Sequence, residues 1–473
     1  MERIAQRETE VAELREQVAQ ALARIHELEG QQSKNSRNSS KPPASDGWTH
    51  QPKSQRKASG QKRAGQVGHA GHHLELVQTP DEVRRYRPSR CAQCQCSLEE
   101  VDGDVAERRQ VLELPPMRLV VTEHQVEAVQ CPRCHSLNQG NFPTTVCAPA
   151  QYGTGVKALA VYLHQYHLVP LERTVELLED LCGSRLSEGT RLGWEHEAAS
   201  RLEPTMERLA EAVACSRLQH ADETGIRVEG KLHWLHVNST RFLTHLAWHK
   251  RRGRTALEAI GIWPRFGGRA MHARWKRYDG YPCAHSVCAA HVLRELTLLS
   301  EHEQQEWAAQ MKDRLLSMHD AAQQWQERGA PCLALVERDE WVAQYFAILL
   351  HGSAAQSCTL APASPTAKRR RPKQAAAKQR LDDLLRRAEQ VLAFRDDLSI
   401  LFTNNQAERD LRMVKVQQKS AGTFRSAGGA TVFCRIRSDL STMRKQDHRL
   451  LAALTAVFAG QPFPIASNRQ GVT

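Results

Sequence analysis

The chain has 473 residues, of which 41% are hydrophobic, and a formal net charge of +12. This length is enough for several domains, and the absence of any run of 18 apolar residues excludes a membrane-spanning helix. The N-terminus is charged and has no apolar secretion segment, so we expect a cytoplasmic protein whose thirteen cysteines are thiols or metal ligands rather than disulfides. The positive charge favours a polyanionic partner, DNA or RNA, although a soluble basic protein without one has the same composition.

Residues 1–30 are predicted to form a coiled coil. The a and d positions of four heptads hold mostly apolar side chains, which are Ile4, Val11, Val18, Ile25, Leu14, Ala21 and Leu28. β-Branched residues at a and leucine at d favour a parallel dimer, and Gly30 is expected to end the helix. A single amphipathic helix that packs on its own chain is the alternative.

Residues 31–80 are predicted to be a basic flexible linker. The sequence is rich in Ser, Asn, Gly, Pro and Gln up to residue 73, and such a composition cannot bury a core. It could lie along DNA phosphates and order on binding, or serve only as a solvated tether. The candidate DNA contacts are Lys41, Lys53, Arg56, Lys57, Lys62 and Arg63.

Residues 81–150 are predicted to be a zinc-binding domain. Two Cys-x-x-Cys pairs supply four candidate ligands, Cys91, Cys94, Cys131 and Cys134. Such pairs, separated by strand-like sequence that includes Arg118–Thr122, are typical of a zinc ribbon, in which Zn²⁺ replaces a core too small to fold alone. Cys96 and His135 are interpreted as bystanders, and four unligated thiols are the alternative.

Residues 151–212 are predicted to be helical. Helices are expected over residues 156–167, 171–182 and 188–202. Gly183 would end the second of these, and Ser187 would cap the third. This arrangement resembles a helix-turn-helix, with Thr190, Arg191 and Trp194 near the start of the recognition helix. A helical hairpin that contacts no DNA is the alternative.

Residues 213–460 are predicted to form a mixed α/β domain, followed by a tail over 461–473. Strands are expected over 219–228, 232–239, 242–249 and 268–273, and helices near 255–261, 288–300 and 303–350 and from about 381, 405 and 431. Residues 353–380 are a low-complexity basic insertion. Three antiparallel strands, a helix, a strand and later helices follow a ribonuclease-H-like order, in which the first and fourth strands end side by side. The fold class is therefore multidomain α/β, with a coiled coil, a zinc ribbon, a helical region and a ribonuclease-H-like mixed sheet with a helical insertion.

Two acids of this domain are placed to share metal ions. Asp222 lies on the first strand and Glu408 near the start of a late helix. Two-metal phosphoryl transfer needs such carboxylates, whose hard oxygens suit Mg²⁺ or Mn²⁺. Either acid alone is more often a surface charge. The third acid that this chemistry needs is missing, because Ala273 stands at the end of the fourth strand.

Several long motifs stand in one characteristic order. They are Asn38–Gly47, Gly65–His69, the two Cys-x-x-Cys pairs, Asp222–Gly225, Cys288–Leu296 and Asn404–Arg412. With them the chain resembles transposases of the insertion-sequence-66 family over nearly its whole length. The resemblance implies a DDE enzyme that uses Mg²⁺ or Mn²⁺ to cut element ends and join them to target DNA. From the heptads we also expect a homo-oligomer formed through the coiled coil. Accessory transposition proteins are candidate partners, and a nucleoid-associated location in the cytoplasm is expected.

The resemblance also assigns residue roles. Asp222 matches the first catalytic acid of the family and Glu408 the last. The middle acid is expected in a His-Asp-x-Trp-x-x-Tyr context, and this chain reads His272-Ala273-Arg274-Trp275-Lys276-Arg277-Tyr278. Alanine offers no oxygen to a metal, so we expect activity to fall by orders of magnitude. The alternative function is a DNA-end-binding regulator of transposition without catalysis.

Two further acids are weak substitutes for the missing one. Asp279 would need a local shift to reach the site, and Glu223 follows Asp222 on a strand and so points to the opposite face. By the resemblance, Cys288 and His291 support the site. Cys283 and His285 suggest a second zinc site, although packed side chains are the commoner explanation.

The late helix carries basic side chains after Glu408. Arg409, Arg412 and Lys415 fall three residues apart and so share one face, which suits DNA phosphates. A solvated basic face is the alternative. A ribonuclease-H-type nuclease that acts on RNA is a third hypothesis, which a coiled coil, a zinc ribbon and a basic arm favour less than assembly on DNA ends.

Overall fold

The computed structural model describes residues 2–35, 38–39, 74–183, 186–330, 332–357 and 376–466. The chain divides into two units, Ser54–Val120 and Met1–Lys53 with Val121–Thr473. No helix within the described ranges is long and apolar enough to cross a membrane. The linker side chains predicted to contact DNA lie outside the described residues; these are Lys41, Lys53, Arg56, Lys57, Lys62 and Arg63.

The N-terminal helix is longer than predicted. α1 covers Glu2–Gln32 and continues through Gly30, so the predicted helix end is wrong. A helical glycine costs only about 1 kcal/mol, and the helix-forming Gln31 and Gln32 follow it. Six large apolar side chains of α1 that the structure describes are between 46% and 60% exposed; they are Val11, Leu14, Val18, Leu22, Ile25 and Leu28. A coiled-coil partner would cover such a stripe, and the coiled coil remains a prediction.

Residues 74–150 contain little regular structure. The strand predicted at Arg118–Thr122 is wrong, because this segment is extended chain without ladder partners. Val120 and Val121 are 84% and 89% exposed, so the described part of the chain gives them little packing to stabilise a strand. The strands form instead around the second cysteine pair, where β1 (Ala128–Gln130) pairs antiparallel with β2 (Leu137–Gln139).

The helical region follows the predicted order with two differences. It comprises α2 (Thr154–Val161), the π-helix η2 (Tyr162–Tyr166), α3 (Leu171–Cys182), α4 (Glu188–Arg201) and α5 (Glu203–Ala214). The first predicted helix therefore changes to a π-helix, and α5 was not expected. Gly183 ends α3 with a φ of 68°, and the Ser187 hydroxyl accepts a hydrogen bond from the Thr190 N–H, as predicted.

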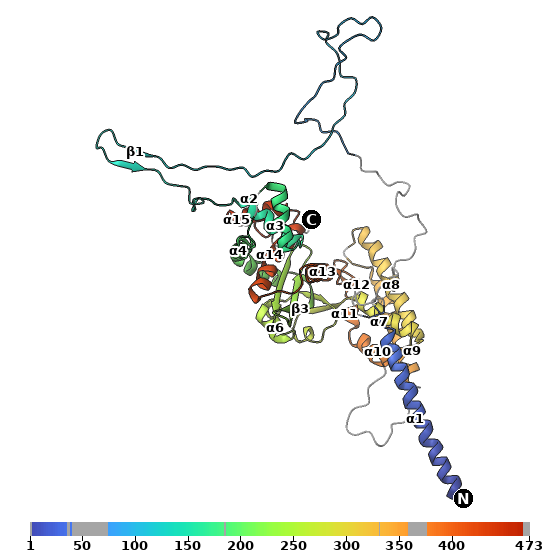
Figure 1. The fold of residues 1–473 in the computed structure, drawn as a ribbon. Helices are drawn as coiled ribbons and strands as arrows, with labels where there is room; N and C mark the ends of the chain where they lie inside the picture. The colour runs from blue at the N-terminus through green and yellow to red at the C-terminus, as the bar shows by residue number, and fades with distance from the viewer. Residues whose placement is uncertain are drawn as a thin grey trace. The chain divides into compact units, whose positions relative to one another are not determined.

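A five-stranded mixed sheet lies at the centre of the larger unit (Figure 1). Its strands are β3 (Leu218–Val228), β4 (Lys231–Ser239), β5 (Thr244–His249), β6 (Arg269–His272) and β7 (Ala284–Val287), in the order β5-β4-β3-β6-β7. β3, β4 and β5 are antiparallel, whereas β6 and β7 run parallel to β3. The predicted adjacency of the first and fourth strands is confirmed by the pairing from Leu218↔Arg269 to His220↔Met271.

Helices cover both faces of the sheet. The remaining helices are α6 (Arg254–Ile260), η3 (Trp263–Arg265), η4 (Tyr278–Gly280), α7 (Ala289–Glu301), α8 (Glu306–Glu327), α9 (Leu335–Ser357), α10 (Ala376–Arg386), α11 (Ala388–Val391), α12 (Ala393–Asp396), α13 (Asn405–Ser420), α14 (Ala427–Lys445) and α15 (Leu450–Phe458). One face packs Leu235 and Val237 against α13 and α14. The other packs Ala221 and Ala270 against α6, η3 and η4.

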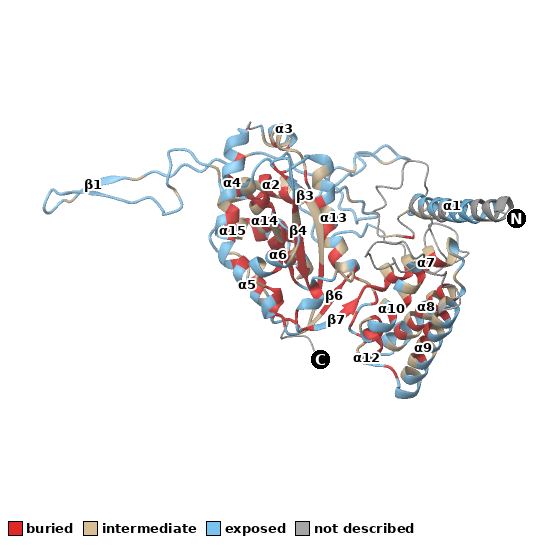
Figure 2. Ribbon diagram, turned by 90° about the horizontal axis from the view of Figure 1, so that it is seen from below, coloured by how far each residue is buried: buried red, intermediate tan, exposed pale blue. Residues whose placement is uncertain are grey.

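The helices from α7 to α12 form a helical insertion whose core also includes Met271 of β6 and Val287 of β7, and the buried residues of these helices are red in Figure 2. The predicted low-complexity insertion over 353–380 is too wide, because residues 353–357 belong to α9 and 376–380 to α10. Packing explains why α9 and α10 extend into the predicted insertion. Gly352 lies against the Trp307 side chain, and Ala377 and Leu381 are buried. Residues 358–375 lie outside the described ranges.

Gly268 provides a test of the β3–β6 junction. A Cβ at this position would lie 2.5 Å from the Ser216 carbonyl oxygen and 2.6 Å from that of Arg217. We expect Gly268→Ala to cost about 1–3 kcal/mol, because backbone must move, and thermal unfolding of the full chain to begin several degrees lower. Gly267→Ala is the control, since nothing lies within 4 Å of a Cβ there. Equal melting of both variants would contradict the close approach.

Candidate active site

Asp222 and Glu408 lie on the same side of the sheet. Asp222 is on β3, and Glu408 is in the first turn of α13, which packs against β3. Burial, together with the negative charges of Glu223 and Glu408, raises the pKa of Asp222 from its usual 3.8 to about 7. The two acids predicted from sequence are therefore near enough to repel each other.

Position 273 follows β6, the strand that pairs with the Asp222 strand β3. The β3–β6 ladder ends at His220↔Met271, and Asp222 and Ala273 each follow two residues later. The methyl group of Ala273 is half-buried at this strand end. The parallel strands β3 and β6 end at the same edge of the sheet, so a carboxylate at position 273 would lie beside Asp222. The alanine at this position offers no oxygen ligand to a metal.

The loop after β6 is fastened to β3 by the aromatic residues that follow Ala273. Tyr278 donates a hydrogen bond to Glu223 over 2.5 Å, and Arg252 pairs with the same carboxylate. The Arg252 guanidinium also lies 4.7 Å from the Trp234 ring centre and 4.6 Å from that of Trp275. Glu223 is thus fully engaged away from Asp222, which agrees with its predicted unsuitability as a metal ligand.

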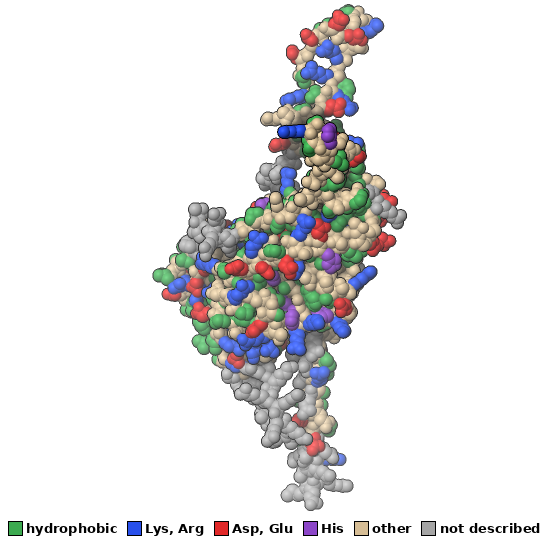
Figure 3. All heavy atoms as spheres, turned by 90° about the vertical axis from the view of Figure 1, so that its left-hand side faces the viewer, with side chains coloured by type: hydrophobic (Ala, Val, Ile, Leu, Met, Phe, Trp, Pro, Cys, Tyr) green, Lys and Arg blue, Asp and Glu red, His purple; other side chains and the backbone are tan. Residues whose placement is uncertain are grey.

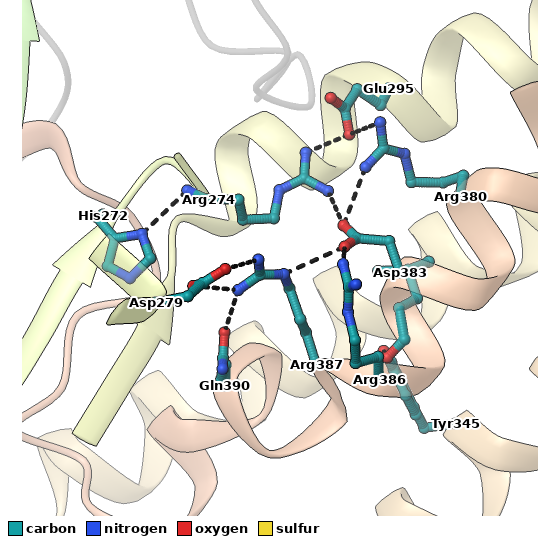
Figure 4. Close-up of polar contacts among 11 residues, drawn as sticks. His272, Arg274, Asp279, Glu295, Tyr345, Arg380, Asp383, Arg386, Arg387 and Gln390 are labelled. Atoms are coloured by element: carbon teal, nitrogen blue, oxygen red, sulfur yellow. Dashed lines mark hydrogen bonds and ion pairs between the residues drawn. The ribbon is translucent and has the colours of Figure 1, made fainter. Parts of the chain in front are cut away.

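The other side of this loop is fastened to the helical insertion (Figure 4). Arg274, which follows Ala273, pairs with Glu295 of α7 and with Asp383 of α10, the latter at 2.9 Å. Asp279 accepts two hydrogen bonds from Arg387, at 2.5 and 2.9 Å. Burial opposes ionisation of Asp279, but the hydrogen bonds and charge of Arg387 still lower its pKa. Its carboxylate is committed to Arg387, so replacement of the missing acid by Asp279 finds no support.

Asn404 connects the segments that carry the site, and sequence analysis assigned it no role. Its amide donates to the Ala221 carbonyl over 2.9 Å and its Oδ1 lies 3.1 Å from His220 Nδ1, while its backbone N–H donates to Cys288 Sγ over 3.1 Å. Asn404 is the N-cap residue of α13, but its side chain makes no capping bond. An asparagine before a helix ordinarily signals a cap, so only its contacts reveal this function.

Cys288 and His291 lie beside Glu408. Cys288 is fully buried at the start of α7, and His291 Nδ1 is 4.0 Å from Glu408 Oε1. Neither of these two atoms has a hydrogen-bond partner within the described part of the chain. One ligand atom from each of the three side chains falls within 4.8 Å of the others. The structure thus places the two predicted support residues against the last acid, and their catalytic role remains a prediction.

Cys283 and His285 belong to a hydrogen-bonded chain. The Arg274 N–H donates to His272 Nδ1, which leaves His272 Nε2–H to donate to His285 Nδ1 over 3.0 Å. His285 Nε2 then lies 3.1 Å from the Tyr281 carbonyl. Burial lowers the pKa of His272 to about 3, so its ring is neutral. Both nitrogens of His285 are occupied, and a second zinc site here finds no support.

The two Cys-x-x-Cys pairs share one local backbone geometry. In each pair the N–H of the first cysteine donates to the carbonyl five residues later, at 2.9 Å in the first pair and 2.8 Å in the second. The residue after the second cysteine is left-handed in both, with φ of 62° at Gln95 and 55° at His135. Such turns direct both thiols to one side and suit a structural zinc ion. The pairs belong to different units, so their union in one four-thiolate site remains a prediction.

Cys96 is more than a bystander. Its Sγ lies 3.1 Å from Cys94 Sγ, just as the Ser136 hydroxyl lies 3.0 Å from Cys134 Sγ in the second pair. Hydrogen bonds from the backbone and thiol of Cys96 lower the pKa of Cys94 to about 7. Cys96 and Ser136 therefore occupy equivalent positions, at which a donor stabilises the thiolate that a metal needs.

This equivalence predicts how Cys96 variants bind zinc. Cys96→Ser should retain zinc affinity because a hydroxyl serves at position 136, whereas Cys96→Ala should weaken it roughly tenfold. Competition with a chromogenic chelator would measure both dissociation constants. Equal weakening by serine and alanine would show instead that the Cys96 sulfur is itself a ligand.

The predicted DNA contacts differ in exposure. Arg191 is fully buried and paired with Glu195, so its predicted DNA contact is wrong in this structure. The helix places its guanidinium toward the core, a direction that the motif does not reveal. Arg409, Arg412 and Lys415 are exposed on α13, as the predicted basic face requires. On the face drawn in Figure 3, Lys and Arg are interspersed with Asp and Glu.

The raised pKa of Asp222 predicts a pH dependence. Well below its usual pKa of 3.8 the carboxyl is protonated in both folded and unfolded chains, so its burial costs little. As pH rises from about 4 to about 7, the unfolded chain ionises while the folded chain keeps the proton, so stability is lost progressively, and above about 7 the loss levels off because both states are ionised. Asp222→Asn should therefore stabilise the metal-free chain increasingly from about pH 5 to about pH 8, by roughly 1–3 kcal/mol. Chemical denaturation at both pH values tests this. A pH-independent difference would contradict it.

Family models match most of the chain. A model described as the transposase IS66 family matches residues 149–432, which is more than half of the chain. The zinc-finger binding domain of transposase IS66 matches residues 88–135, and a family of unknown function matches residues 1–75. No curated protein matches the chain.

Proposed function

Because the chain belongs to the transposase IS66 family, we propose that it cleaves the ends of its DNA element and joins them to target DNA at a metal site between Asp222 and Glu408. The observation that carries this proposal is the placement of Asp222 on β3 and of Glu408 in the first turn of α13, the helix that packs against β3. Burial and then the negative charges of Glu223 and Glu408 raise the pKa of Asp222, and Glu408 Oε1 is buried without a hydrogen-bond partner among the described residues. Both features fit carboxylates arranged to hold a divalent cation.

The chain's own residues would hold and orient the reacting groups. Asp222 and Glu408 are the oxygen ligands, and Mg²⁺ or Mn²⁺ bound to them would activate the attacking oxygen and stabilise the leaving one. Water attack would free a 3′-hydroxyl at the element end, and that hydroxyl would then attack target DNA. Arg409, which directly follows Glu408, and Arg412, one helical turn beyond Glu408, are exposed and would hold nearby phosphates.

The architecture supports further parts of the proposal. Three antiparallel strands followed by two strands parallel to the first, with an acid on the central strand, favour a ribonuclease-H-like domain. The exposed apolar stripe of α1 fits pairing of two copies. The zinc domain and the basic linker fit binding to element ends. This binding would take place on the nucleoid, with or without accessory proteins.

Ala273 makes this copy an impaired enzyme within the proposal. Its neighbours Trp275 and Tyr278 hold the loop in place, but the side chain at position 273 is a methyl group and offers no carboxylate. The alternative function is regulation, in which the chain binds element ends and dimerises without cutting. This alternative is favoured by the same observation, since Ala273 removes a ligand without removing any contact that fastens the loop.

A strand-transfer assay with Mn²⁺ separates the two functions. We expect Ala273→Asp to raise joining by about a hundredfold or more, since it restores a metal ligand. Ala273→Asn is the matched control, because asparagine has a volume similar to that of aspartate but no charge. Adding Asp222→Asn to the Ala273→Asp chain should abolish the gain. Robust joining by the unaltered chain would contradict impairment, and no gain from Ala273→Asp would contradict the assignment of position 273. Competition between DNA and RNA substrates would test the remaining hypothesis of an RNA nuclease.

A further inference from the structure

Three unlike ligand groups converge where α7 meets α13. Cys288 is the N-cap residue of α7, His291 lies in the first turn of that helix, and Glu408 lies in the first turn of α13. Cys288 Sγ, a nitrogen of His291 and an oxygen of Glu408 lie within 4.8 Å of one another. The motif that contains Cys288 and His291 thus meets an acid 117 residues later in the chain (408 − 291).

The ligand atoms are poorly satisfied by the protein alone. His291 Nδ1 and Glu408 Oε1 are buried and lack hydrogen-bond partners within the described part of the chain, although they lie 4.0 Å apart. An unsatisfied buried polar group costs roughly 1–3 kcal/mol. A cation between these two atoms would satisfy both. Cys288 Sγ already accepts the Asn404 N–H, a contact that also suits a thiolate ligand.

The donor set selects the class of metal. Sulfur, imidazole nitrogen and one carboxylate oxygen suit Zn²⁺, whereas Mg²⁺ prefers oxygen ligands alone. Tetrahedral zinc sites have ligand atoms roughly 3.3–3.8 Å apart. The 4.0 Å separation of His291 Nδ1 and Glu408 Oε1 is close to that range, so a small side-chain rotation would complete the site. Three protein ligands leave a fourth position open.

We propose that Cys288, His291 and Glu408 form a second zinc site, distinct from the Cys-x-x-Cys pairs, and that Zn²⁺ bound there withdraws Glu408 from the catalytic metal and so inhibits strand transfer. The binding part needs only the three side chains. The inhibitory part rests on the proposed transposase function. Zinc binding would also release the Cys288 proton, because the thiolate is the ligand form.

Metal content tests the site without any activity. The full chain, loaded with Zn²⁺ and freed of excess metal, should hold one equivalent more than Cys288→Ser or His291→Ala. Cys434→Ser is the matched control, since Cys434 is a buried cysteine packed in another core, and it should retain the unaltered zinc content. His291→Ala guards against misfolding, because Nδ1 of His291 has no hydrogen bond to lose among the described residues. Equal zinc in the unaltered chain and in His291→Ala would overturn the proposal.

Replacement with Co²⁺ identifies the ligands directly. The second site should add a single sulfur–cobalt charge-transfer contribution that disappears in Cys288→Ser, and Glu408→Gln should weaken Co²⁺ binding at that site by roughly tenfold or more. An unchanged cobalt spectrum in Cys288→Ser would overturn the assignment of the thiolate.

The inhibitory part is tested in the Ala273→Asp chain. Added Zn²⁺ should slow its strand transfer, and the same addition should slow an Ala273→Asp/His291→Ala chain much less relative to that chain's own zinc-free rate. Equal inhibition of both chains would overturn the inhibitory part and leave the metal-content result standing. Failure of the Ala273→Asp chain to join DNA would count against the proposed function, and the metal content would still decide the zinc site.

Discussion

The buried side chain of Asn404 is the constraint on which the site depends. Its amide donates to the backbone of β3 at Ala221, and its backbone N–H donates to Cys288 at the start of α7. A buried amide without partners is costly, so these bonds set where α13 begins relative to the sheet. Glu408 is one turn further along α13, and its N–H bonds the Asn404 carbonyl. The position of Glu408 is therefore set by the uncharged side chain of Asn404, one helical turn before it.

The loop after β6 explains how a catalytic position can change while its motif stays intact. Trp275 and Tyr278 attach the loop to β3 through Arg252 and Glu223, and Arg274 attaches it to the helical insertion. Each of these side chains stabilises the fold whether or not a carboxylate stands at position 273. Ala273 makes no such contact. The contacts that hold the loop therefore do not depend on the catalytic acid. For this reason the structure keeps all the loop contacts although one of the three acids is missing.

Short sequence patterns correctly predicted helix ends that depend on the residue at the end itself. Gly183 and Ser187 marked the end of α3 and the start of α4, because a left-handed glycine and a capping hydroxyl act within one turn. Patterns failed where packing decides. The strand expected at Arg118–Thr122 pairs with no strand in the described ranges, α1 continues through Gly30, and the short strand β7 exists because β6 supplies its hydrogen bonds. Arg191 was assigned to a DNA-facing surface, but its side chain is buried against Glu195.

The sequence by itself determined the order of the domains, the family, the two acids and the alanine between them, because these depend on residue types and their order along the chain. Only the tertiary structure decided which atoms meet. It brought His291 to Glu408, committed Asp279 to Arg387 and made Asn404 the link between β3 and α7. These contacts join residues between 108 and 183 positions apart in the chain. A local pattern does not encode such pairings, since burial and hydrogen bonding across the whole fold select them.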